Sequence, residues 1–235
     1  MIQLFTTAPC SRIGASGLKH RLFVPLRRGM LAALLLCTAW VAQAQNLTVK
    51  VNTTTKTGQA SLQAAIEASN VQLADITSIE ITKGTFTAED WNYLNSIRYN
   101  INLESFTITK GITSVADMPD LSDWTSYFPR SLSSVSIDAS FAIGAYAFYN
   151  CYKLTSISLP AATSIGSYAF EYCSALTTVS LPAATSIGHE AFQYCPALTT
   201  VSLPAATSIE YDAFYGCSVL TFFELGATPP PNDWI

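Results

Sequence analysis

Positive charge is scarce in this sequence once its first 44 residues are set aside. Of the 12 Lys and Arg residues among 235, five lie before residue 45, and only Lys153 follows Arg130. All 16 Asp and Glu residues lie after residue 45, so that part carries seven basic and 16 acidic residues, a net charge of −9. Nucleic-acid binding requires basic side chains that neutralise phosphates. This balance therefore argues against a nucleic-acid partner and against an anionic membrane surface.

Histidine and catalytic motifs are also scarce. Only His20 and His189 occur, and the sequence has no Ser/His/Asp set, paired-carboxylate motif or phosphate-binding glycine loop. No C-x-x-C pair with a nearby histidine supplies the usual spacing of zinc ligands. We therefore expect neither an enzyme nor a metal or other cofactor. His189 stands where neighbouring repeats have Ser167 and Tyr211, so we expect it at a solvated, variable position.

The first 44 residues have the pattern of a secretory signal peptide. Four basic residues between positions 19 and 28 precede the apolar run Leu31–Val41, which the small-residue site Ala42-Gln43-Ala44 follows. The apolar run is shorter than the roughly 20 residues that a transmembrane helix needs. We expect residues 1–44 to be removed, which would leave Gln45 as the mature N-terminus. The mature chain is then secreted or at the cell surface, with no transmembrane span.

A repeat of 22 residues dominates the rest of the chain. Residues 159–180 and 181–202 are identical at all but four positions. Such a period is typical of a stacked solenoid, because no single unit can bury its apolar face alone. The apolar columns begin at Ile143, Ala147, Phe148, Cys151 and Leu154, and each recurs three more times at this interval.

Each repeat contains a strand with the pattern L-x-x-[IVF]-x-[IL]. Branched apolar residues alternate with Ser or Thr, which predicts a half-buried strand, and proline follows three of these strands. The pattern continues upstream at longer intervals, to strands that begin near Ile76 and Leu103. We predict an α/β solenoid with one parallel β-sheet of about seven strands and with short helices and turns on its outer side. Its repeats are irregular over 76–131 and regular over 132–225.

The segments beside the array are expected to protect its ends. Residues 45–75 combine a predicted strand over 47–52 with a predicted helix over 61–69, an arrangement that suits an N-terminal cap. Thr87 and Asp90 have the spacing of a capping box, which predicts a second helix. The Pro-rich tail, 226–235, is expected to cover the last repeat with Trp234.

Four cysteines occupy one column of the repeat, at Cys151, Cys173, Cys195 and Cys217. In an exported protein, four cysteines permit two disulfides. Neighbouring strands have a spacing that a disulfide tolerates, but parallel side chains would not point towards each other. We favour a structural ladder of buried free thiols, with disulfides as the alternative.

The unit I-G-x-x-A-F-x-x-C-x-x-L-x-x-V-x-L-P resembles the BspA-type leucine-rich repeats of secreted and cell-surface bacterial proteins. The match covers residues 132–225, and Glu210 departs from it by replacing a glycine, which predicts an imperfect last turn. The resemblance implies a right-handed leucine-rich-repeat solenoid. It also implies a non-enzymatic role in adhesion or protein binding, towards host matrix, host cells or other bacteria. It carries over no binding residue.

Two surfaces are candidates for contact with such a protein or cell-surface ligand. Solenoids commonly bind through the face that their strands form, and tyrosines on the opposite side are rivals because tyrosine is enriched at interfaces. A structural spacer in a surface layer is the alternative function, and a water- or ice-ordering Ser/Thr face is a remote one. The oligomeric state stays open. The strand-face candidates are Ser156, Ser158, Thr178, Ser180, Thr200, Ser202 and Phe222, and the rival tyrosines are Tyr146, Tyr168, Tyr172, Tyr194 and Tyr211.

Overall fold

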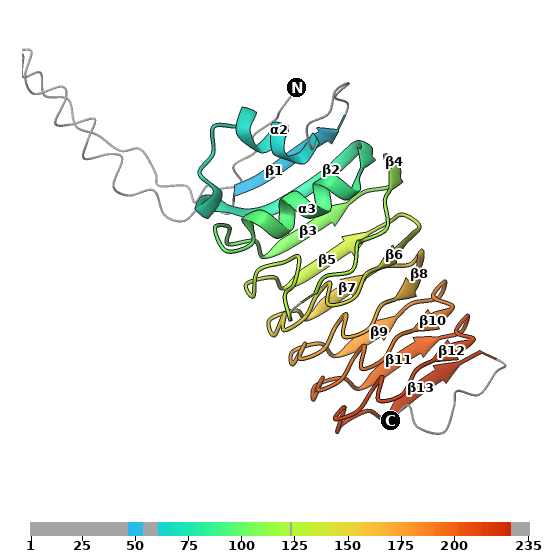
Figure 1. Cartoon of the computed structure of the whole chain (residues 1–235). Coiled ribbons are helices and arrows are strands. Elements are labelled where there is room, and N and C mark those ends of the chain that lie inside the picture. The colour runs from blue at the N-terminus through green and yellow to red at the C-terminus, as the bar shows by residue number, and fades with distance from the viewer. Residues whose placement is uncertain (1–46, 54–60, 123, 227–235) are drawn as a thin grey trace, which may run out of the picture.

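The structure is a computed structural model that describes residues 47–53, 61–122 and 124–226. The predicted leader and most of the predicted Pro-rich tail lie outside the described residues. None of the helices in the described part has the length and apolar character that crossing a membrane requires. The described residues form an elongated array whose successive turns stack along one axis (Figure 1), as the 22-residue period predicts.

Eight strands lie side by side along one face of the array (Figure 1). Seven of them are the strands that the repeat pattern predicts, and the eighth is the predicted strand of the N-terminal cap. Their hydrogen bonding is interrupted between β7 and β9, so the face consists of two parallel ladders rather than one continuous sheet. The first ladder contains β1 (Leu47–Thr53), β2 (Ile76–Phe86), β3 (Ser105–Ile108), β5 (Ser134–Ile137) and β7 (Ser156–Ser158); the second contains β9 (Thr178–Ser180), β11 (Thr200–Leu203) and β13 (Phe222–Leu225).

A second row of short strands runs along the array, and the repeat pattern does not predict it. Its four strands pair in parallel, one per regular repeat. An additional strand, β4 (Ile112–Val115), pairs with the end of β2. In β4 and β8 two polar residues separate the apolar ones, and β10 and β12 contain only two residues each, so most of these strands lack the period-two alternation that indicates a strand. The row contains β6 (Phe141–Ile143), β8 (Ala162–Ile165), β10 (Ser186–Ile187) and β12 (Ser208–Ile209).

The helices of the described chain all lie in its irregular half, as α2 (Ser61–Ala68), the 3₁₀ turn η1 (Leu73–Asp75) and α3 (Ala88–Ile97). The predicted capping box begins α3, where the backbone N–H of Thr87 donates to Oδ2 of Asp90 at 2.8 Å. The other oxygen of this buried carboxylate accepts the N–H of Leu62 at 2.8 Å. Asp90 therefore joins the starts of both helices.

Tight turns take the place of helices on the outer side of the regular half. Each repeat places two residues at positive φ, for example Tyr168 at 61° and Tyr172 at 60°. Alternate N–H groups of the turn donate to the following repeat, as in the 2.7 Å bond from Phe170 to the Ala191 carbonyl. The outer side is thus hydrogen-bonded from repeat to repeat, like the strand face.

The core contains a continuous stack of phenylalanine rings. Phe148, Phe170, Phe192 and Phe214 follow one another with ring centroids 4.8, 5.1 and 5.2 Å apart and nearly parallel planes. All four side chains are buried. Because each ring contacts the ring before and the ring after it, the core is shared along the whole regular array.

The glycine column marks a close approach between repeats. A Cβ atom added to Gly166 would lie 2.6 Å from the backbone nitrogen of Ala145, and one added to Gly188 would lie 2.7 Å from that of Ser167. In the last repeat, the N–H of Glu210 still donates to the Ile187 carbonyl at 2.9 Å. The replacement of glycine by Glu210 predicts an imperfect last turn. This backbone hydrogen bond between the last two repeats is nevertheless formed.

Candidate binding surfaces

The predicted strand-face residues lie in register within each of the two ladders. Thr178 is paired with Thr200, which in turn is paired with Phe222. Ser180 is paired with Ser202 in the same way. The hydroxyl-bearing residues of β7, β9 and β11 are exposed or partly exposed, whereas the apolar residues that alternate with them in β9 and β11 are buried. The arrangement produces two parallel columns of small polar groups on one face.

These columns extend further than the sequence predicts, because they continue into the irregular repeats. Ser134 and Ser136 of β5, which begins the regular array, pair with Ser105 and Thr107 of the irregular part, and with Ser156 and Ser158 of the next repeat. Upstream repeats differ in length, so a fixed interval does not align them with the regular ones. The upstream members of the two columns are Ser78, Ser105 and Ser134 in one, and Glu80, Thr107 and Ser136 in the other.

The last strand changes the chemistry of this face. Strand β13 places Phe222 and Glu224 where earlier strands have Ser or Thr. Phe222 is 53% exposed, and the hydroxyl of Ser202 donates to Oε2 of Glu224 at 2.6 Å. The strand face therefore offers hydroxyl donors and acceptors along most of its length, with an exposed ring and a carboxylate at one end.

The four column cysteines are free thiols, three of them buried and Cys217 partly buried. The Sγ atoms of Cys173, Cys195 and Cys217 lie 3.2–3.3 Å from the carbonyl oxygens of Phe148, Phe170 and Phe192, each one repeat earlier. Burial raises the pKa of the Cys151 thiol to about 12.

Metal-binding clusters are missing from this part of the molecule. Within the described residues, no three His, Cys, Asp or Glu side chains are grouped in a way that could hold a metal ion. The thiols of Cys173, Cys195 and Cys217 instead donate to backbone carbonyl oxygens.

The rival tyrosines form stacked pairs on the outer turns. Tyr146 and Tyr168 lie 4.7 Å apart between ring centroids, and Tyr172 and Tyr194 lie 5.2 Å apart, both pairs nearly parallel. Tyr172, Tyr194 and Tyr211 are exposed. The outer side therefore presents aromatic faces, in contrast to the hydroxyl columns of the strand face.

His189 is not the solvated residue that its variable column predicts. Its side chain is only 13% exposed, and its Nε2 lies 2.6 Å from a carboxylate oxygen of Glu190. The imidazole also packs between the rings of Tyr168 and Tyr211, with centroids 5.1 and 3.8 Å away. The prediction was wrong because side chains from adjacent repeats enclose this position.

Glu171 is an acidic residue inside the outer turns. Its side chain is 2% exposed, and its Oε2 has no hydrogen-bond partner among the described residues. Burial, assisted by the charge of Glu190, raises the pKa of the Glu171 carboxyl to about 7. Glu171 stands at one of the four positions that differ between residues 159–180 and 181–202, yet it is buried.

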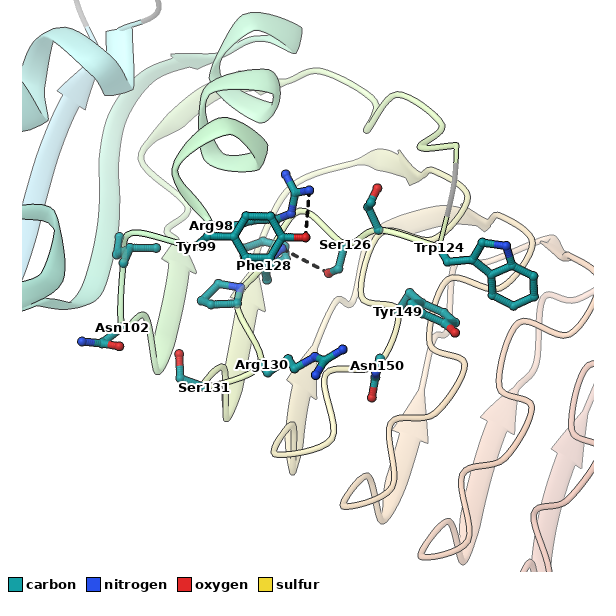
Figure 2. A pocket seen from close by; sticks show the side chains of 13 residues that line it. Arg98, Tyr99, Asn102, Trp124, Ser126, Phe128, Arg130, Ser131, Tyr149 and Asn150 are labelled. Carbon is teal, nitrogen blue, oxygen red and sulfur yellow. Dashed lines mark hydrogen bonds between the residues drawn. The ribbon is translucent and has the colours of Figure 1, made fainter.

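A pocket of about 470 Å³ opens between the loop that follows α3 and residues 124–131, where the irregular repeats meet the regular ones. Figure 2 shows the side chains that line it. Trp124, Tyr149 and Asn150 stand 22 residues before Tyr146, Glu171 and Tyr172, in variable columns of the repeat, and the other lining residues precede the regular array. The invariant columns therefore do not indicate this pocket. Its polar and aromatic lining includes Arg98, Tyr99, Asn102, Trp124, Arg130 and Tyr149.

Comparison with known proteins identifies the repeats. The family model of the BspA type leucine rich repeat region matches residues 125–228, in six copies. This match confirms the resemblance that the 22-residue unit indicates. It also confirms the leucine-rich-repeat fold class. No curated protein matches the sequence.

Two solved structures are similar to this chain. A leucine rich cell surface protein from Faecalibacterium prausnitzii A2-165 is 26% identical, with a TM-score of 0.42, over 73% of this chain and 42% of its own. The leucine rich repeat protein of T. pallidum is 23% identical, with a TM-score of 0.40, over 57% of this chain and 73% of its own. This chain thus spans less than half the length of the first of them.

Proposed function

Because residues 125–228 belong to the BspA-type leucine-rich repeats, we propose that this is a non-enzymatic, secreted or cell-surface protein that binds other macromolecules. The proposed activity is adhesion to a host matrix protein, a host cell or another bacterium. Two features support export: the predicted leader at residues 1–44 and the name of the similar cell surface protein. No step of this function needs a cofactor.

The strand face is the surface that we assign to the contact. The observation that carries this assignment is the alignment of its Ser and Thr residues, which pair in register from β3 to β7 and again from β9 to β11, next to the exposed Phe222 of β13. A flat row of hydroxyl groups can form many weak hydrogen bonds to a partner, and an exposed aromatic ring supplies apolar contact area. Such repetition suits a partner surface that is extended.

A binding assay with matched variants tests this proposal. Purified mature protein would be applied to immobilised matrix proteins, epithelial cells and bacterial cells. Replacing Ser158 and Ser180 together by arginine should reduce binding at least about tenfold, because two large cations then interrupt the hydroxyl columns. Ser218→Arg, at an exposed hydroxyl outside the strand face, is the control and should bind normally.

The same assay distinguishes an adhesive protein from the alternative, a structural spacer. A spacer would bind none of these surfaces, and the arginine variants would then behave like the parent protein. Export is measured separately, by mass spectrometry of culture supernatant and cell envelope. A cytoplasmic product that retains Leu31–Val41 would contradict the proposed localisation.

A further inference from the structure

We propose that the pocket between the α3 loop and residues 124–131 binds a sugar ring that carries a carboxylate, such as a hexuronic acid unit of a polysaccharide. This site lies on the outer side of the array, among turns, and is separate from the strand face. It also involves a different class of ligand from the protein partner proposed above. The inference rests on the charge, aromatic content and geometry of the pocket lining.

The charge of the pocket is opposite to that of the protein. The chain after Gln45 carries seven basic and 16 acidic residues, yet two of those basic residues, Arg98 and Arg130, line this one pocket. No acidic side chain is among the described residues that line it. Guanidinium groups pair with carboxylates through parallel hydrogen bonds. The pocket therefore favours an anionic ligand in a molecule whose remaining surface repels one.

The two arginines differ in how much of their hydrogen-bonding capacity is already used. The guanidinium of Arg98 donates to Asn95 and to the hydroxyl of Tyr99, and it lies 4.2 Å from the centroid of the Tyr99 ring. Arg130 is exposed and has no ion-pair partner within the described part of the chain. Arg98 is thus held in position, and Arg130 is the group that we assign to the ligand carboxylate.

Aromatic rings at the rim suit a sugar better than a small inorganic anion. Tyr99 is 81% exposed and Trp124 is 62% exposed, and Tyr149 also lines the pocket. One face of a pyranose ring presents C–H groups, which pack against the electron-rich face of an aromatic ring. A bare carboxylate or phosphate would gain nothing from these rings.

Asparagine side chains supply the remaining polar groups. Asn102 and Asn150 line the pocket, and Nδ2 of Asn102 donates to the Ala74 carbonyl at 2.9 Å. This bond fixes the position of the Asn102 amide. An amide both donates and accepts hydrogen bonds, which matches the hydroxyl groups of a sugar.

The turn that contains Trp124 leaves most of its indole ring exposed at the rim of the pocket. Trp124 has a φ of 57°, in the left-handed region that bulky residues rarely adopt. Its ring is nevertheless mostly exposed, with the rings of Tyr146 and Tyr149 at centroid distances of 5.9 and 5.8 Å. The same φ recurs 22 residues apart at Tyr146, Tyr168, Glu190 and Asp212, so this conformation belongs to the turn of the repeat. The exposure of the indole ring is what favours a ligand contact here.

The test measures binding of defined oligosaccharides to the purified mature protein. The charged probes are oligogalacturonate and a hyaluronan tetrasaccharide, which present uronic acids from two different polymers, and the neutral probes are maltotriose and chitotriose. Saturation-transfer NMR detects weak binding, and calorimetry gives the affinity. We expect binding of at least one charged probe, weaker binding of neutral probes, and a loss of affinity as salt is raised.

Three variants separate the roles of the pocket residues. Arg130→Gln should weaken binding of the charged probe at least about tenfold and leave any neutral-probe binding unchanged. Trp124→Ala should weaken both. Lys153→Gln removes an exposed cation outside the pocket and should change neither. Circular dichroism and thermal melts of each variant show whether the fold is retained.

Several outcomes would overturn the proposal. They are the absence of binding to both charged probes, equal losses for Arg130→Gln and Lys153→Gln, and tighter binding of a short acidic peptide than of either uronic-acid probe. The last outcome would identify the pocket as a peptide site. The strand-face variant, in which Ser158 and Ser180 are replaced by arginine, should still bind the charged probe. The sugar-binding proposal and the adhesion proposal can therefore be contradicted independently of each other.

Discussion

At the scale of single residues, Glu171 is the side chain that fits its position least well. It is buried, one of its oxygens has no hydrogen-bond partner among the described residues, and the pKa of its carboxyl is raised to about 7. The same column holds Gln193 in the next repeat, which shows that a neutral amide can occupy an equivalent site. Burial of the charged carboxylate therefore opposes folding.

We predict that Glu171→Gln stabilises the protein at pH 8 but not at pH 4. The carboxyl has a pKa of about 7 when folded and an ordinary value of 4.5, so the folded state binds the extra proton between these values. Stability then falls as pH rises from about 4.5 to 7, and the deficit persists above that range. The amide removes this deficit, about 1–3 kcal/mol at pH 8.

Denaturant unfolding of the parent and the variant at both pH values measures this difference. Gln193→Glu, which adds a carboxyl to the same column, should have the opposite effect at pH 8. Equal stabilities of Glu171→Gln and the parent at pH 8 would show that the Glu171 charge is compensated.

The cysteine column gives the second residue-scale prediction. The Sγ of Cys195 lies 3.2 Å from the Phe170 carbonyl oxygen, so a serine hydroxyl at this position has an acceptor nearby. We expect Cys195→Ser to cost about 1 kcal/mol, close to the cost of Cys195→Ala, since the polar group is not left without a partner. Urea unfolding of the two variants measures this. A serine variant less stable than the alanine variant by more than about 2 kcal/mol would mean that the hydroxyl cannot reach the carbonyl.

The sequence predicts invariant residues better than variable ones. Phe170 and Leu176 recur in every regular repeat and are buried, as the period implies. His189 and Glu171 stand at positions that vary between repeats, and His189 was expected in solvent, yet the turns enclose both side chains. Variation within a column indicates that the repeat does not require one residue there. It does not measure how closely neighbouring repeats approach.

At the scale of elements, the glycine column controls how closely consecutive repeats can stack. We predict that Gly166→Ala destabilises the protein by about 1–3 kcal/mol, because the new Cβ would lie 2.6 Å from the Ala145 nitrogen and the backbone must move. Thermal unfolding followed by circular dichroism measures the change. Ala161→Gly is a control at a partly exposed position of the same repeat and should cost less than Gly166→Ala. An unchanged melting temperature for Gly166→Ala would show that the repeats can separate slightly without loss.

Elements of the main strand face were predictable because each presents alternating apolar and polar residues. The second row of strands was not, since two adjacent polar residues separate the apolar ones in β8 and only two residues form β10 and β12. The pocket was hidden for a different reason. Arg98, Trp124 and Arg130 come from repeats of irregular length, so no common interval relates them, and only the fold brings them together.

For the whole molecule, the structure is a linear stack in which each repeat contacts its immediate neighbours. Hydrogen bonds join consecutive repeats along the strand rows and along the outer turns, and the phenylalanine rings join them in the core. In such an array, stability is approximately a sum of the repeats and their interfaces. The effect of a defect should therefore depend on its position along the stack.

We predict that Phe170→Ala destabilises the entire regular array, whereas Phe214→Ala mainly loosens its C-terminal end. Phe170 packs between Phe148 and Phe192, so its loss weakens two interfaces in the middle of the stack, at a cost of about 3–5 kcal/mol. Phe214 contacts Phe192 on one side and the partly exposed Phe223 of the last strand on the other.

Hydrogen exchange followed by mass spectrometry distinguishes these outcomes. Phe214→Ala should increase exchange in β12 and β13 while β5 and β8 stay protected, because those strands keep both of their neighbours. Phe170→Ala should increase exchange on both sides of the substitution and lower the unfolding midpoint of the whole chain. Identical exchange patterns for the two variants would mean that the array unfolds as one unit, in which the position of a defect has no influence.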